Sequence, residues 1–269
     1  MANEERERVR NRRMLAKKAE FVRLVKIDGC PICRTCKQEL DRYWFWFFSE
    51  SYGMGNTVAK YIDYYGFCEK HSLEIAKRGP PWQKSAIYRW IIDNNLPQME
   101  KVLGSLGDLK IFHSRDLLPS RLDLKGSRKK KIASITRTGN CLMCDLVQQT
   151  AKDSIKDLMD LLVWDSDIIQ AFRNSYGLCM IHFFFAGESI RPEYLSAYRE
   201  ILNVEILRLK QLKSDFEEFF KKGDYHHAGD PKGSEQKTWI RALRRFIGDL
   251  DFAEEKLADG VRRQSTDAT

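Results

Sequence analysis

The feature that most constrains this chain is a set of cysteine and histidine residues that occurs twice in the same order and spacing. Cys30-Pro-Ile-Cys33 is followed by Tyr65-Gly-Phe-Cys68-Glu-Lys-His71, and Cys141-Leu-Met-Cys144 is followed by Tyr176-Gly-Leu-Cys179-Met-Ile-His182. Each residue of the second set lies 111 positions after its counterpart in the first. Recurrence of rare residues at one fixed period predicts a tandem duplication.

The residue types in this pattern are those that hold a structural metal ion. A Cys-x-x-Cys turn places two thiolates on one side, and a Cys-x-x-His at a helix start does the same with a thiolate and an imidazole. Two such pairs supply four ligands in a tetrahedron, the arrangement that zinc prefers in structural sites. We therefore predict two zinc ions per chain, with the ligands Cys30, Cys33, Cys68, His71, Cys141, Cys144, Cys179 and His182. A set complete at four ligands leaves no position for a substrate or an activated water, so we do not expect an enzyme that works at the metal.

The sequence leaves open which ligand pairs meet. We favour an arrangement in which each half closes its own site, because the 34 residues between Cys33 and Cys68 leave room for one helix out and one helix back. In the alternative, Cys30 and Cys33 meet Cys179 and His182 across a pseudo-twofold axis.

The remaining sequence predicts an all-α protein, because apolar residues recur at helical spacing and no convincing period-two pattern is present. A helix from Trp82 is expected to end near Pro97, and another is expected near residues 151–164. From Pro192 a long helix repeats apolar residues every seven positions, and Glu205 interrupts the adjoining apolar row. At about 1.5 Å per residue it would reach roughly 40 Å, long enough to brace both halves.

The predicted organisation follows the duplication. We divide the chain into a basic helix over residues 1–27, a first helical repeat over 28–103, a basic connector over 104–138, a second repeat with the long helix over 139–222, a C-terminal loop and helix over 223–257, and a disordered tail over 258–269. The aromatic run at residues 43–48 is interpreted as core, with a partner or dimer surface as the alternative.

The net charge of the chain and its expected cellular compartment indicate what it could bind. The chain has a net charge of +8 and no apolar run long enough to span a bilayer, and its first residues lack the apolar segment of a signal peptide. We expect a cytoplasmic protein, in which clustered cysteines hold metal more often than they form disulfides. Seven basic residues of the connector could bind the phosphates of a nucleic acid, although a solvated linker is slightly favoured: Arg121, Lys125, Arg128, Lys129, Lys130, Lys131 and Arg137.

Other residues have weaker interpretations. Cys36 follows Cys33 by one helical turn and has no counterpart, because position 147 is Val147; it is interpreted as a buried thiol that could substitute as a ligand. His226 and His227 suggest a second metal or acid–base site, but a hydrogen-bonding loop is favoured. Rival readings of the twin motif are a redox dithiol, an iron–sulfur cluster, or exchangeable sites for metal sensing or handling.

With these motifs in view, the chain resembles an uncharacterised family of prokaryotic proteins, a domain of unknown function with tandem CxxC…GxCxxH motifs. The resemblance covers about residues 25–250 and includes two weaker closing elements, Lys222-x-Asp-Tyr225 and Glu235-x-x-x-Trp239-x-x-Ala242-x-x-x-x-x-Gly248. It implies the fold and the ligands but carries no activity. The function that we expect is a non-enzymatic zinc-binding helical scaffold that contacts a protein or nucleic-acid partner through its surface.

Overall fold

The computed structural model describes residues 15–106, 133, 135–227 and 229–248. Over these residues the chain is helical and contains no β-strand, which confirms the all-α class. Several expectations fall outside the described residues: the start of the basic helix, the tail over 258–269, and the connector residues Arg121, Lys125, Arg128 and 129–131. None of the described helices combines the length and the apolar character needed to cross a lipid bilayer.

The helices follow the same offset as the ligand motifs. The main elements are α2 (Pro31–Trp46), α3 (Gly55–Asp63), α4 (Glu69–Lys77), α5 (Pro81–Leu106), α7 (Leu142–Trp164), α8 (Ser166–Arg173), α9 (Met180–Glu188), α10 (Leu195–Gly223) and α11 (Thr238–Ile247). Helices α2 and α7, α3 and α8, and α4 and α9 start 111 residues apart, pair by pair. Helix α7 therefore starts at the ligand motif, nine residues before the helix that periodicity alone predicts.

The chain divides into two compact units. Unit 1 comprises Met1–Glu39 and Gln149–Thr269, and unit 2 comprises Leu40–Gln148. The division falls inside two helices: α2 begins in unit 1 and ends in unit 2, and α7 begins in unit 2 and ends in unit 1. Each unit consequently contains helices from both halves of the sequence.

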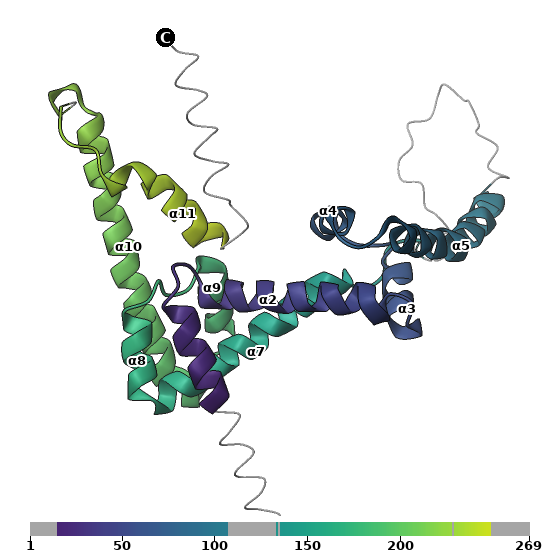
Figure 1. Ribbon diagram of the computed structural model, residues 1–269, viewed down its shortest axis with the longest axis horizontal. Coiled ribbons are helices and arrows are strands. Elements are labelled where there is room, and N and C mark those ends of the chain that lie inside the picture. Colours follow the sequence, from purple (N-terminus) through teal and green to yellow (C-terminus); the bar gives the residue numbers. More distant parts are fainter. Residues whose placement is uncertain (1–14, 107–132, 134, 228, 249–269) are drawn as a thin grey trace, which may run out of the picture. The chain divides into compact units, whose positions relative to one another are not determined.

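In unit 1, α10 packs against α8, α9 and α11 (Figure 1). A one-turn 3-10 helix at Pro192–Tyr194 precedes α10, and two more lie at Tyr225–His227 and Ser234–Lys237. The described part of the N-terminal helix, residues 15–25, buries Phe21 against Phe172 of α8, with ring centroids 6.4 Å apart. Lys17 and Lys18 form ion pairs with Asp157 and Asp165, so these two basic side chains hold the helix in the unit.

In unit 2, the aromatic run splits between core and surface. Trp44 and Phe47 are buried and contact Phe67, whereas Phe45 is 65% and Trp46 49% exposed. The run ends in a π-helical turn, Phe47–Ser51, in place of a regular α-helical end. A helix can turn only part of its circumference to the core, which explains why the core interpretation holds for some of these residues and not for others.

Helix α5 continues through Pro97 to Leu106, so the predicted end near Pro97 is wrong. Proline removes one backbone donor and commonly kinks or breaks a helix at a cost of about 3 kcal/mol. Here the helix packs against α3, Asn95 donates to the Ile62 and Ile91 carbonyls, and Val102 is buried beyond the proline. Tertiary contacts on both sides of Pro97 therefore outweigh the local preference.

Candidate metal centres

Each ligand pair lies at the start of a helix. Cys30 and Cys141 immediately precede α2 and α7, and Cys68 and Cys179 are the N-cap residues of α4 and α9. In all four cases the carbonyl of the first ligand residue accepts a hydrogen bond from the amide four residues later, at 2.8 to 3.2 Å. The second ligand stands three residues on, on the same face of the first turn. The positive ends of these helices face the sulfur atoms, which favours thiolates.

Glycines form the turns that lead into the second ligand pairs. Gly66 and Gly177 have φ angles of +107° and +82°, in the region that L side chains rarely adopt. A Cβ atom on Gly177 would lie 2.5 Å from a carboxylate oxygen of Glu205. In the second half of the chain, a side chain at the glycine of the Gly-x-Cys motif would clash with Glu205, which explains why glycine stands there.

The four pairs meet across the halves, not within them. Cys30 and Cys33 come together with Cys179 and His182, and all four ligand atoms lie within 4.8 Å of one another. Our preferred arrangement, in which each half closes its own site, is therefore wrong. Phe67, next to Cys68, packs on Trp44 in the part of α2 that belongs to unit 2, whereas Cys33 at the start of α2 belongs to unit 1.

The first centre, Cys30, Cys33, Cys179 and His182, lies wholly in unit 1. The Cys33 and Cys179 sulfur atoms are 3.6 Å apart, and His182 Nδ1 lies 3.1 to 3.6 Å from the three sulfur atoms. Around one zinc ion with ordinary bond lengths, tetrahedral edges measure about 3.8 Å between sulfurs and about 3.6 Å between sulfur and nitrogen. The ligand atoms are thus spaced for a single ion.

The second centre, Cys68, His71, Cys141 and Cys144, lies wholly in unit 2. The Cys68 and Cys144 sulfur atoms are 3.6 Å apart, and His71 Nδ1 lies 3.1 to 3.6 Å from the three sulfur atoms. Its spacing matches that of the first centre, as expected for residues in corresponding positions of the two halves.

The electrostatics of both centres suit a cation. Burial raises the pKa of Cys30, and it raises the pKa of Cys144 to about 12. Burial also lowers the pKa of His71, which keeps the imidazole neutral as a metal ligand requires. Hydrogen bonds from Cys30 and Cys33 lower the pKa of Cys179, so one sulfur of the first centre carries the negative charge. Three adjacent thiolates would repel one another in such a place, and a bound dication removes that repulsion.

An ion pair behind the first centre fixes its second ligand loop. Arg245 of α11 and Glu205 of α10 are 5% and 1% exposed and approach to 2.6 Å. Arg245 also donates to the carbonyls of Tyr176 and Leu178, and Glu205 accepts from the Leu178 amide. Burial raises the pKa of Glu205 to about 7, against the opposing effects of Arg245 and the Leu178 amide. The loop before Cys179 is therefore held by polar contacts from two helices.

The end of α11 covers the first centre. Gly248 has a φ of +87°, and a Cβ atom there would lie 3.3 Å from Cys33 Sγ and 3.7 Å from Cys179 Sγ. Arg244 pairs with Asp28, two residues before Cys30, at 2.8 Å. The predicted closing block thus contacts both ligand loops. Sequence reasoning did not predict that the closing block contacts the ligand loops. The signal for it in the sequence was Glu205, a charged residue in an otherwise apolar row.

The second centre is more open. Cys144 is half-buried, and a cavity of about 370 Å³ lies against Cys141, Cys144 and Tyr64. The Nε2 atom of His71 is buried and has no hydrogen-bond partner among the described residues. Metal-binding histidines ordinarily donate this second N–H to an acceptor that fixes the ring. The two centres therefore share a ligand set but differ in what surrounds it.

The other candidates take no part in these centres. Cys36 is buried and belongs to neither group. His227 pairs with Asp230 at 3.0 Å, and neither His226 nor His227 joins a metal-binding group within the described ranges. This agrees with the hydrogen-bonding loop that we favoured. Arg137, the one described residue of the basic set, lies over the Tyr64 ring.

Comparisons with known proteins assign the chain to a protein family. No curated protein and no solved structure gave a match. A family model, described as a family of unknown function (DUF6062), matches residues 23–252, which include all eight candidate ligands and the closing block. The chain belongs to this family of unknown function, as its twin ligand motifs indicated.

Proposed function

We propose that the protein is a helical scaffold in which two structural zinc ions hold the two units in their folded form. The observation that supports this most directly is the gathering of eight ligand atoms into two sets, each within 4.8 Å. Each set contributes four protein ligands, the number that completes the coordination of a structural zinc ion. Folding and metal binding would then be coupled.

The spacing favours a single ion over an iron–sulfur cluster. The four ligands of a multi-iron cluster are divided among two or more iron atoms, so those on different irons stand farther apart than the edge of one tetrahedron. Sulfur atoms 3.6 Å apart suit one shared metal ion. The same atoms are too far apart for a disulfide, whose sulfurs lie about 2.05 Å from each other.

The proposal is tested by metal analysis of protein purified anaerobically without added metal. Two zinc ions per chain and no visible absorption would support it. Iron with sulfide and a brown chromophore would contradict it and would indicate electron transfer or redox sensing. Zinc that a mild chelator removes while both units stay folded would indicate metal handling instead.

We further propose that the scaffold works in a reducing compartment, the cytoplasm, and that residues 121–137 contact a phosphate-bearing partner. The seven basic residues there support the second point, because neutralised phosphates make affinity strongly salt-dependent. Replacing residues 128–131 by serine should leave the melting temperature unchanged, weaken binding to a single-stranded oligonucleotide, and flatten its salt dependence. Unchanged binding would remove the basic segment from the proposal.

A further inference from the structure

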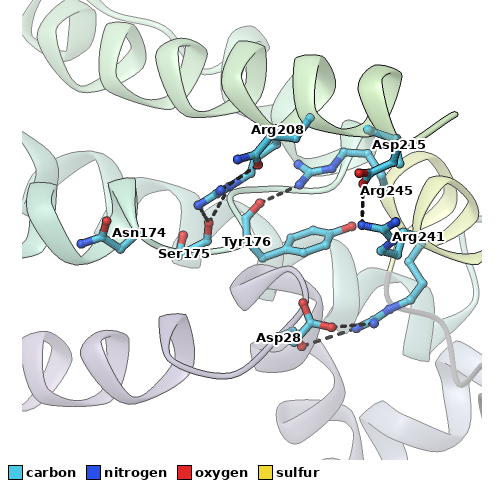
Figure 2. A pocket seen from close by; sticks show the side chains of 11 residues that line it. Asp28, Asn174, Ser175, Tyr176, Arg208, Asp215, Arg241 and Arg245 are labelled. Carbon is cyan, nitrogen blue, oxygen red and sulfur yellow. Dashed lines mark hydrogen bonds and ion pairs between the residues drawn. The ribbon is translucent and has the colours of Figure 1, made fainter. Parts of the chain in front are cut away.

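A second site of a different kind lies in unit 1. A cavity of about 320 Å³ opens between α10, α11 and the loop before Cys179 (Figure 2). Its size is at the lower end of the range for small-molecule pockets, which is about 300–1,000 Å³. Most of the residues that line it carry a polar or charged side chain. The charged side chains that line it are Arg208, Arg241, Arg244, Arg245, Asp28 and Asp215.

The charges on these walls do not cancel. Asp28 pairs with Arg244 at 2.8 Å, and Asp215 pairs with Arg241 at 2.6 Å. The buried Glu205, which does not line the cavity, neutralises Arg245 from behind. With Glu205 counted, the four guanidinium groups around the cavity face three carboxylates, which leaves one positive charge in excess.

Arg208 is the least compensated of the four. Its guanidinium donates to the carbonyls of Arg173 and Ser175 and to the side chain of Gln211, all of them neutral acceptors. Within the described part of the chain it forms no ion pair with a carboxylate. Its positive charge is consequently held in place beside the cavity.

Two buried donors on the same walls have no acceptor. The Tyr176 hydroxyl and Arg241 Nε are both buried and without a hydrogen-bond partner among the described residues. Figure 2 shows the Tyr176 ring directed toward the Arg241 side chain. Arg245 lies over the same ring, 4.1 Å from its centroid, and holds it in position. Buried donors without a partner are unfavourable, so a side-chain adjustment that brings either donor to an acceptor in the cavity would stabilise the arrangement.

We propose that this cavity binds the phosphate group of a small phosphorylated molecule or free inorganic phosphate. Phosphate oxygens accept several hydrogen bonds at once, and arginine is the side chain best suited to hold them. A phosphate monoester carries about −1.5 to −2 charges at pH 7, and the uncompensated charge of Arg208 on the lining attracts such an anion. This site is separate from the metal centres and does not depend on the proposed scaffold function.

The test uses the full-length, metal-loaded chain, with sodium phosphate and glycerol 3-phosphate as probes and sodium chloride at equal ionic strength as the reference. We expect either phosphate compound to raise the melting temperature above the chloride value. Titration calorimetry then distinguishes the two sources. Tighter binding of the ester indicates a phosphorylated molecule, and tighter binding of inorganic phosphate indicates the free ion; either result supports the site.

The Tyr176→Phe variant separates binding from folding. The hydroxyl has no partner, so its removal should leave the chloride melting temperature unchanged or slightly higher, while phosphate affinity falls on the order of tenfold. Arg241→Lys keeps a positive charge beside Asp215, and its phosphate affinity should fall by a similar factor. Lys213→Gln, an exposed position on α10, is the control and should bind as the wild type does. Phosphate that stabilises no more than chloride, or that binds both cavity variants with wild-type affinity, would overturn the proposal.

Discussion

Arg245 Nη1 and Glu205 Oε2 lie 2.6 Å apart in the interior of unit 1, and between them they hold the backbone of the loop that carries Cys179. The first metal centre is thus supported by a charged pair from two helices that contribute no ligand. The position that corresponds to Glu205 in the first half is Asn94, which is exposed and donates to the Trp90 carbonyl of its own helix. This support therefore belongs to one half of the chain.

Replacing Glu205 by glutamine should destabilise the protein by about 3–5 kcal/mol, because it leaves the Arg245 charge buried without its partner. The measurement is denaturant unfolding with zinc present. Glu200→Gln is the control: it removes the ion pair with Arg173, which is 51% exposed, and should cost about 1 kcal/mol or less. Equal losses in the two variants would show that the buried pair gives no special support.

Gly248→Ala should weaken zinc binding at the first centre. The added methyl would stand 3.3 Å from Cys33 Sγ on a backbone with positive φ, so the end of α11 must move away from the sulfur atoms. Gly104→Ala in α5, where the added carbon meets nothing within 4 Å, should leave zinc affinity unchanged and stabilise the helix by up to about 1 kcal/mol. Competition with a chromophoric chelator measures both. Wild-type affinity in the Gly248 variant would show that α11 does not close the centre.

Zinc should leave the second centre first. Cys144 is half-buried beside a cavity, and the second nitrogen of His71 has no acceptor among the described residues, whereas α11 covers the first centre. Stopped-flow measurement of zinc transfer to a chelator dye should show two kinetic phases. His71→Ala should remove the fast phase, and His182→Ala should remove the slow one. A fast phase that persists in the His71→Ala variant would contradict the predicted order of zinc release.

The aromatic run offers a matched pair of substitutions. Phe47 is fully buried and Phe45 is 65% exposed, two positions apart on the same helical stretch. Phe47→Ala should cost about 3–5 kcal/mol, and Phe45→Ala should stay within about 0.5 kcal/mol. Thermal unfolding of the zinc-loaded protein compares them. Similar losses would mean that Phe45 contributes to folding through contacts that its exposure does not reveal.

Local structure was predictable from sequence because its causes are local. The Cys-x-x-Cys and Gly-x-Cys-x-x-His spacings predicted turns at helix starts, and helices begin at all four. The helical class and the terminal helix also followed from periodicity. Pro97 was misleading because tertiary packing on both sides of it maintains α5. Local helix propensity gives no information about such packing.

The pairing was not predictable in this way. The two Cys-x-x-His pairs offer the same chemistry to Cys30 and Cys33, so composition cannot choose between them. We favoured the nearer pair because the 34 residues between Cys33 and Cys68 leave room for one helix out and one helix back. The fold decides otherwise, because Phe67, next to Cys68, packs on Trp44 within unit 2, the unit that also contains Cys141 and Cys144. The contribution of Arg245 likewise depends on a contact between distant parts of the sequence.

The measurement that tests the central claim most directly is the zinc content of two double variants. Cys33→Ser with His182→Ala removes two ligands of one centre, so we predict one zinc ion per chain. Cys33→Ser with His71→Ala removes one ligand from each centre, so we predict none that resists mild chelation. The opposite result, no zinc in the first variant and one in the second, would show that each half closes its own site and would contradict the crossed arrangement.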